Sequence, residues 1–245
     1  MPNTIELAKK FVPLLDEVYK VASLTADLDG NPELVQQGAN ANELIIPMLS
    51  MSGLGDYSRN GGYVDGDVTL TNETIKCNYD RGRMFIVDNM DNIETAGIAF
   101  GRLAGEFIRT KVVPELDAFR FAQYAGTSGI SKVATGATLS TGDAVIKALR
   151  AATDKMDEDE VPLDQRYLYI TPTLLGLVQD MDTTKSREVM ANFAKVVKVP
   201  QTRFYTAITL KSGKVVTNGE GDTATTVDET AGGYVKASGA ADINF

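Results

Sequence analysis

The stretch that decides the fold is residues 84–126, MFIVDNMDNIETAGIAFGRLAGEFIRTKVVPELDAFRFAQYAG. A short apolar run, Met84 to Val87, leads into a segment with apolar residues at every third or fourth position, in two neighbouring rows: Ala96, Phe100, Leu103 and Phe107; Ala104, Ile108, Val112, Leu116 and Phe119. This spacing predicts one buried face on an amphipathic helix. A single helix over residues 92–124 would extend roughly 50 Å at ~1.5 Å per residue, longer than a compact domain of this size needs.

Pro114 lies inside this predicted helix. Proline cannot donate to the carbonyl of Thr110, and its ring disfavours helical geometry at the preceding Val113. The sequence therefore predicts a kink or a break at this point.

Composition excludes several classes of function. The 245 residues include no histidine, so histidine-based catalytic triads, imidazole general bases and histidine-bearing zinc sites are all excluded. Cys77 is the only cysteine, which rules out an intramolecular disulfide, and its alternation with Ile75 and Tyr79 predicts a small buried residue. We expect no enzymatic activity and no cofactor.

Charge and hydropathy limit the partners. The net charge of −9 argues against tight, specific binding of nucleic acid, which needs clustered Lys and Arg. No apolar run approaches the length that crosses a bilayer, and residues 1–10 lack a signal-peptide pattern, so we expect a cytosolic origin and no membrane partner.

A glycine-rich segment precedes the long helix. Glycines and acidic residues fill 53–67, and two alternating runs follow, Val68 to Leu70 and Ile75 to Tyr79, with Asn72 and Glu73 between them. This pattern predicts a long two-stranded excursion with a tip too polar to bury against its own domain. Because an isolated hairpin is marginal in water, we expect it to rest on a partner.

The charged residues of this excursion are the candidate intersubunit contacts: Asp56, Arg59, Asp65, Asp67, Lys76, Arg81 and Arg83. In one interpretation, the basic members bind carboxylates such as Asp56, Asp65 and Asp67 on a neighbouring copy. In the other, all of these charges simply face solvent. The sequence does not decide between the two.

The second half of the chain predicts an α+β module. Ser140 and Asp143 fit the start of a helix over 144–156, residues 167–170 read as a strand, and Thr171 with Pro172 opens another helix. Residues 206–210 and 214–217 predict a hairpin, and 218–233 a surface loop. Ile243 and Phe245 alternate like the start of a buried strand, which is typical of a fragment of a longer chain.

Four short motifs suggest ion or phosphate binding, and each has a simpler interpretation. The acidic run 157–160 lacks the spacing of a calcium loop and fits a solvated connection. Asp27-x-Asp29-x-Asn31 has Pro32 where a calcium loop needs glycine. Gly53-x-Gly55 and Gly219-x-Gly221 do not continue as phosphate loops.

Taken together, the excursion, the Met84 to Asp91 lead-in, the long helix and the later α+β module resemble a tailed-phage major capsid protein of the HK97-like fold. The wording Gly-Arg-Met-Phe-Ile-Val-Asp (82–88) and Glu-Phe-Ile-Arg-Thr-Lys-Val-Val-Pro-Glu-Leu-Asp (106–117) is similar to that family's strand and spine helix.

The resemblance implies an α+β fold with an N-terminal arm (1–46), an extended β-hairpin loop (47–83), a peripheral domain with the spine helix (84–126) and an axial domain (127–245). It implies a structural subunit that self-assembles into hexamers and pentamers of an icosahedral head around double-stranded DNA. A scaffolding protein and a portal are the further partners, and the virion, assembled in the bacterial host cytoplasm, is the location.

This chain departs from the family pattern in two ways. Members of the family usually continue with further strands beyond the point that corresponds to Phe245, and the lysine, asparagine and glutamate of their covalent crosslinks have no match here. Two alternatives stay open: an encapsulin-like compartment shell that holds an enzyme cargo, and an enzyme that uses carboxylates and a metal.

Overall fold

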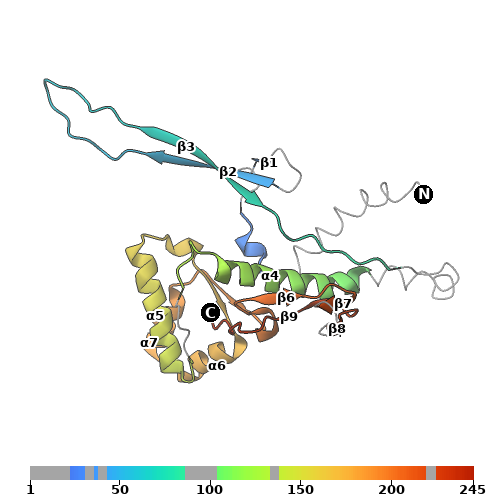
Figure 1. Ribbon diagram of the computed structural model, residues 1–245. Coiled ribbons are helices and arrows are strands. Elements are labelled where there is room, and N and C mark those ends of the chain that lie inside the picture. The colour runs from blue at the N-terminus through green and yellow to red at the C-terminus, as the bar shows by residue number, and fades with distance from the viewer. Residues whose placement is uncertain (1–22, 31–35, 38–42, 86–103, 133–137, 219–224) are drawn as a thin grey trace. The chain divides into compact units, whose positions relative to one another are not determined.

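The computed structural model describes residues 23–30, 36–37, 43–85, 104–132, 138–218 and 225–245. The chain forms two compact units, one of residues 28–93 and the other of residues 1–27 with 94–245 (Figure 1). We call them the hairpin unit and the body. Both helices and strands are present, which confirms the predicted α+β class. The finer HK97-like architecture stays a prediction.

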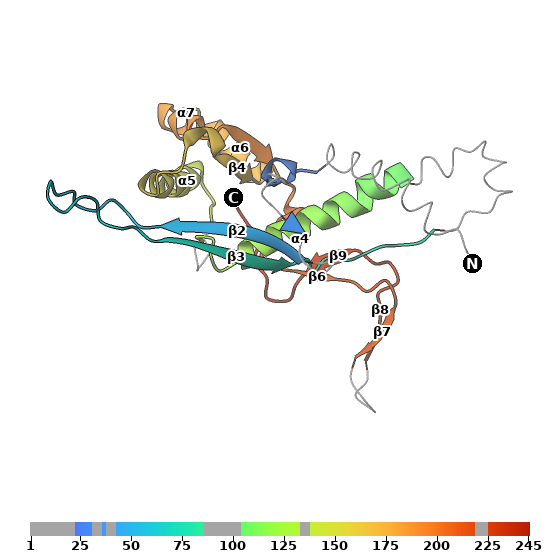
Figure 2. The same cartoon turned by 90° about the horizontal axis from the view of Figure 1, so that it is seen from above.

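The hairpin unit is an antiparallel sheet of three strands in the order β1-β2-β3, in which β1 is Gln36–Gln37, β2 is Glu43–Met51 and β3 is Val68–Lys76. Figure 2 shows β2 and β3 side by side along their length. Glu43 lies opposite Lys76 and Met51 opposite Val68. A two-stranded excursion is present, as predicted, but its strands are β2 and β3 and not the two predicted runs, of which the first lies on β3 and the second begins on it.

The two alternating runs that the sequence separates at Asn72 and Glu73 are one continuous strand. Nothing between residues 70 and 75 supplies the glycine or proline that a turn needs, whereas Thr71 and Thr74 suit an extended backbone. The expectation of two separate runs was wrong for this reason.

The long helix continues through Pro114 without a break. Residues 104–107 are α-helical, Ile108–Val112 form a π-helical turn (η3), and α4 runs over Val113–Gly126. The N–H of Val113 donates to the carbonyl of Ile108, five residues back. The predicted break at Pro114 was therefore wrong, and the irregularity there takes the form of this wider turn. Residues 92–103 of the predicted helix lie outside the described residues.

The π turn also moves the buried face of the helix. One extra residue in the turn carries the buried row from Ile108 to Val113, Asp117 and Phe121. The predicted row through Val112 and Leu116 is only half-buried. The helical spacing was correct, but its phase after residue 108 was wrong.

The other elements of the body are three α-helices, short 3-10 turns and six strands within its described residues. The helices are α5 (Gly142–Glu158), α6 (Pro172–Met181) and α7 (Thr184–Ala191), with short 3-10 turns η1 (Ala26–Leu28), η4 (Leu163–Gln165) and η5 (Gln201–Arg203). The strands are β4 (Tyr167–Ile170), β5 (Lys195–Lys198), β6 (Ile208–Leu210), β7 (Val215–Asn218), β8 (Thr225–Asp228) and β9 (Tyr234–Lys236).

Helix α5 begins one residue later than the capping pattern predicted. Thr141, not Ser140, is the N-cap, and its hydroxyl accepts from the N–H of Ala144 at 3.3 Å. The predicted start of α6 at Thr171 and Pro172 and the predicted strand at 167–170 are both confirmed.

The predicted hairpin of 206–210 with 214–217 does not form. Gly213 does turn the chain, with φ +74°, but β6 pairs with β9 and β7 pairs with β8. The β-branched run in Thr225–Asp228 supplies the partner for β7, inside a segment that composition had marked as loop. Strands β6 and β7 thus each pair with a strand that comes later in the chain.

The core lies on both faces of the parallel pair β4-β5. Leu168 and Ile170 face a cluster formed with α5, α6 and α7, which also contains Val145, Ile146, Leu149, Leu174, Leu175, Val178 and Val189. On the other face, Tyr169 packs edge-on against Phe121 of α4, with ring centroids 5.6 Å apart, and Phe121 packs against Phe204 at 4.9 Å. Aromatic contacts therefore hold α4 to the sheet.

Gly142 gives a direct test of the α5–α6 contact. A Cβ at this position would overlap the carbonyl oxygen of Leu177 and the sulfur of Met181. We expect Gly142→Ala to lower the free energy of unfolding by ~1–3 kcal/mol, through overpacking. Gly176→Ala in α6, where a Cβ meets nothing within 4 Å, is the control and should stabilise by up to ~1 kcal/mol. Urea denaturation measures both, and equal effects would contradict the contact.

Tyr169 predicts a dependence of stability on alkaline pH. Burial, with a smaller contribution from the nearby Asp27 carboxylate, raises the pKa of its phenol to about 12. Because the unfolded residue titrates near ~10, its contribution is complete below that pH and is lost as pH rises from ~10 toward 12. The Tyr169→Phe variant should lose less stability than the wild type across that window in denaturation series. Parallel curves would refute the assignment.

Candidate interaction surface

The tip of the hairpin unit is a loop with its own internal hydrogen bonds. The Ser52 N–H donates to the carbonyl of Asp67 at 3.0 Å, and the Asp67 N–H donates to the Ser52 hydroxyl at 2.9 Å. Farther out, Ser58 and Gly62 exchange backbone hydrogen bonds, and the Gly61 N–H donates to the Ser58 hydroxyl. Gly62 has φ +74°, a conformation that glycine adopts without strain. Local hydrogen bonds therefore shape the tip.

Large apolar side chains are exposed on this loop. Leu54 is completely exposed, Tyr63 is 87% exposed and Val64 is 69% exposed. Tyr63 lies against Tyr57, with ring centroids 4.9 Å apart. Exposed apolar groups gathered in one place are typical of a surface that binds another molecule.

The hairpin unit has no core within its described residues. None of residues 28–30, 36–37 or 43–85 for which exposure is given is buried, and exposed apolar residues continue along both strands. They are Leu44, Met48, Leu49 and Met51 on β2 and Val68, Leu70 and Ile75 on β3. Cys77, predicted to be buried, is exposed: it directly follows β3, in a unit whose described residues form no core.

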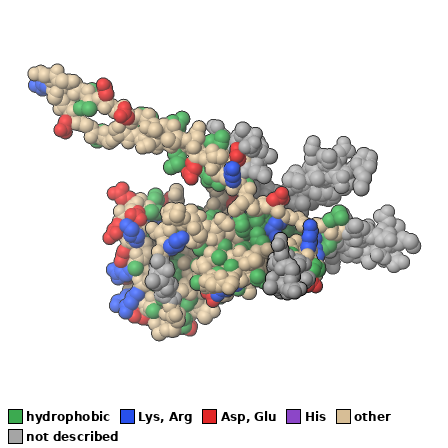
Figure 3. Space-filling view, in the orientation of Figure 1, with side chains coloured by type: hydrophobic (Ala, Val, Ile, Leu, Met, Phe, Trp, Pro, Cys, Tyr) green, Lys and Arg blue, Asp and Glu red, His purple; other side chains and the backbone are tan. Residues whose placement is uncertain are grey.

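The seven predicted contact residues are all exposed and fall at two ends of the hairpin. Asp56, Arg59, Asp65 and Asp67 lie in the tip loop, whereas Lys76, Arg81 and Arg83 lie at the other end of β3. The nine residues of β3 separate the two groups by roughly 30 Å. Acidic side chains are visible along the hairpin in Figure 3.

A second notable site lies inside the body, around Asp117 of α4. Its carboxylate is completely buried. It accepts from the hydroxyls of Ser23 at 2.7 Å and Thr25 at 2.9 Å, and from the Leu24 N–H at 3.2 Å. Arg203 of η5 donates to it at 3.2 Å. Four groups thus satisfy one buried charge, as burial of a carboxylate requires.

Neighbouring contacts extend this attachment of the 23–27 segment. Arg120, one turn along α4, donates to the Thr25 hydroxyl at 3.0 Å, and Lys195 pairs with Asp27 at 2.6 Å. We call these contacts, with those of Asp117, the Asp117 clip. It ties the segment that precedes the hairpin unit to the long helix.

Sequence reasoning missed Asp117, because the predicted phase of the helix put it outside the buried row. A signal was present: Val113, Asp117 and Phe121 are spaced by four, so a carboxylate interrupts an apolar row. The partners Ser23, Thr25 and Arg203 are far away in the sequence, and no local pattern connects them.

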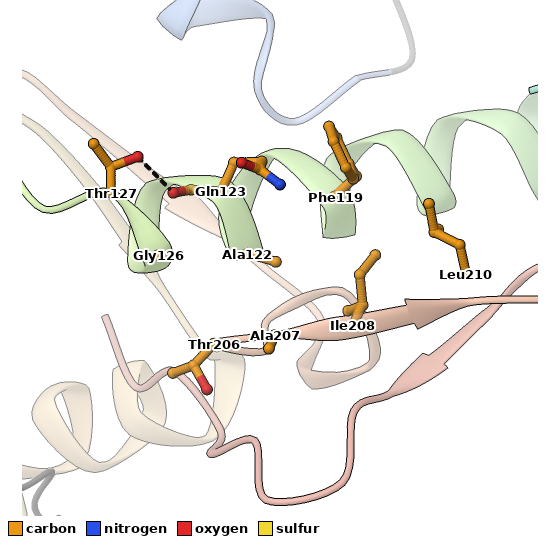
Figure 4. A pocket seen from close by; sticks show the side chains of 9 residues that line it. All are labelled: Phe119, Ala122, Gln123, Gly126, Thr127, Thr206, Ala207, Ile208 and Leu210. Atoms are coloured by element: carbon orange, nitrogen blue, oxygen red, sulfur yellow. Dashed lines mark hydrogen bonds between the residues drawn. The ribbon is translucent and has the colours of Figure 1, made fainter. Parts of the chain in front are cut away.

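The body also has a pocket of about 390 Å³ between α4 and β6 (Figure 4). Its lining is Phe119, Ala122, Gln123, Gly126, Thr127, Thr206, Ala207, Ile208 and Leu210. The Thr127 hydroxyl donates to the Gln123 carbonyl at 2.8 Å. Because the lining contains no ionisable side chain, this pocket offers no side-chain acid or base.

The acidic run 157–160 lies at the C-terminal end of α5, in the last residues of the helix and the turn after it. Asp157 pairs with the buried Arg166 at 2.8 Å, and Asp159 with Lys155 at 3.0 Å. The hydrogen bond from Lys155 to Asp159 raises the pKa of this lysine. The interpretation as a helix-to-strand connection is confirmed. No group of three or more Cys, Asp or Glu positioned to hold a metal occurs in the described ranges.

Comparisons with known proteins identify no relative. No protein-family model matches the chain, and neither the curated proteins nor the solved structures contain a match. Among the helices that the structure describes, none has the length and apolar character to cross a membrane.

The Asp117 clip predicts a large effect of one substitution. Asp117→Ala leaves Arg203, Ser23 and Thr25 without their acceptor, so we expect a loss of ~3 kcal/mol in the free energy of unfolding. Asp154→Ala removes only an exposed pair with Arg150 and should change stability by less than ~0.5 kcal/mol. Urea denaturation compares them. A small effect at Asp117 would contradict the assigned hydrogen bonds.

Proposed function

We propose that this chain is a structural subunit of a protein shell: an HK97-like major capsid protein whose copies form hexamers and pentamers of an icosahedral phage head around double-stranded DNA. The observation that carries the proposal is the hairpin unit, in which the long strands β2 and β3 have no buried side chain. The resemblance of residues 82–88 and 106–117 to that family is the reason why we propose this kind of shell.

The lack of a core in the hairpin supports a shell role on energetic grounds. Ordering each residue costs roughly 1–2 kcal/mol, and burial normally offsets that cost. A hairpin with both faces exposed has little burial, so contact with another molecule is the remaining source of stabilisation. A repeating lattice provides such a contact to every subunit, and many weak contacts then act together.

The charges of the hairpin support self-association in particular. Tip carboxylates and basic residues at the other end are roughly 30 Å apart in one copy, so they can meet only between copies. The body contributes rigid packing around β4-β5, and its pocket carries no ionisable group. A subunit whose work is lattice contact needs this combination and no catalytic centre.

Negative-stain electron microscopy tests the proposal, because closed shells or hexameric and pentameric rings are the expected product of the wild-type chain. We expect Leu54→Ser, Tyr63→Ser and Val64→Ser together to abolish them, since these side chains form the exposed apolar tip. The thermal melting of the body should not change, because none of the three is buried.

The matched control is Leu163→Ser, which removes an apolar side chain with 59% exposure from the body. It should assemble like the wild type. A wild-type chain that stays monomeric at high concentration, or a tip variant that assembles normally, would overturn the proposal. Inside intact shells, nucleic acid indicates a phage head, whereas a bound cargo peptide indicates the encapsulin-like alternative.

A further inference from the structure

Strand β3 has one edge that faces away from β2. Because Ser52 and Asp67 form a hydrogen-bonded pair, alternate residues of the ladder direct their backbone groups toward the partner strand or away from it. The residues whose backbone N–H and C=O groups point away from β2 are Val68, Leu70, Asn72, Thr74 and Lys76. No described strand pairs with this edge.

The opposite edge of the sheet is blocked over part of its length. There β1 covers Ile45, and the next outward position on β2 is Pro47, which has no N–H to donate. Natural sheets use such devices to prevent strand addition. Edge strand β3 has no proline over its nine residues, so it retains every backbone donor. The two edges of the sheet are therefore not equivalent.

The sequence of β3 is complementary to itself in antiparallel pairing. With Asn72 opposite Asn72 of a second copy, all nine residues overlap, and the five outward residues are the ones that bond. Val68 then faces Lys76, Leu70 faces Thr74 and Thr71 faces Glu73, so no like charges are opposed. The arrangement has a two-fold axis at Asn72.

Charge favours the same pairing. Antiparallel alignment brings the acidic tip of one hairpin, with Asp65 and Asp67, beside the basic end of the other, with Lys76 and Arg81. The two groups that are roughly 30 Å apart within one copy are thus adjacent between copies. A second copy of this chain supplies both the strand and the matching charges.

We propose that β3 pairs antiparallel with β3 of a second copy about a two-fold axis at Asn72, which joins two three-stranded sheets into one six-stranded sheet. The pairing uses only the geometry of the hairpin unit and does not depend on the proposed shell. In a shell it would join two subunits across a two-fold contact.

Nitroxide spin labels test the register. In a Cys77→Ser background, a label on Asn72→Cys should show strong dipolar broadening, because the paired Cα atoms are ~5.5 Å apart. A label on Thr69→Cys should give a distance of roughly 20 Å, and one on the natural Cys77 roughly 34 Å, from the strand rise. These two positions are the controls for the label at 72.

Two sets of variants test the backbone hydrogen bonds and the charge pairs that would stabilise the pairing. Thr74→Pro removes an outward donor without affecting the β2 ladder and should weaken dimerisation at least tenfold, whereas Thr74→Val should not. Lys76→Glu with Arg81→Glu should weaken it about tenfold at low salt. Adding Asp65→Lys and Asp67→Lys to that pair should restore it, because the charges are then exchanged. Sedimentation equilibrium measures each.

A monomer at millimolar concentration, or a short distance at 69 instead of 72, would overturn the pairing. Shells whose labels at 72 stay more than ~20 Å apart would overturn it as well, while leaving the shell proposal intact. A dimer with the expected three distances that forms no shell would support the pairing and contradict the shell proposal.

Discussion

The hairpin unit must find its stabilisation outside itself, and the functional account depends on this constraint. The ladder of nine residue pairs between β2 and β3 is complete, yet none of residues 28–30 and 43–85 is buried. Hydrogen bonds contribute little net free energy without burial, so the ladder defines a shape without making it stable. In the account proposed here, a partner provides the burial that the hairpin unit lacks.

The body supplies the rigid counterpart. Its core lies on both faces of β4-β5, and Asp117 fixes the 23–27 segment to α4 where the chain leaves for the hairpin unit. A buried carboxylate is a specific anchor, because its burial is tolerated only while all of its donors are in place. The Asp117 clip thus holds the 23–27 segment in place within the body.

Sequence reasoning found the elements with strong local signals: the two-stranded excursion, the strand at 167–170, the start of α6 and the connection at 157–160. It failed where the structure depends on contacts between residues that are far apart in the sequence. The π turn before Pro114 shifted the helix face, β6 and β7 paired with later strands, and Asp117 found partners about ninety residues away. Periodicity reports local geometry, whereas pairing and buried charge depend on tertiary contacts.

Hydrogen exchange of the hairpin unit as a function of protein concentration tests the central claim most directly. If the hairpin is stabilised by another copy, the amides of residues 43–76 exchange rapidly in dilute solution and become protected as concentration rises, while the amides of β4 stay protected throughout. Protection of the hairpin that does not change with concentration, in a sample that remains monomeric, would contradict the account.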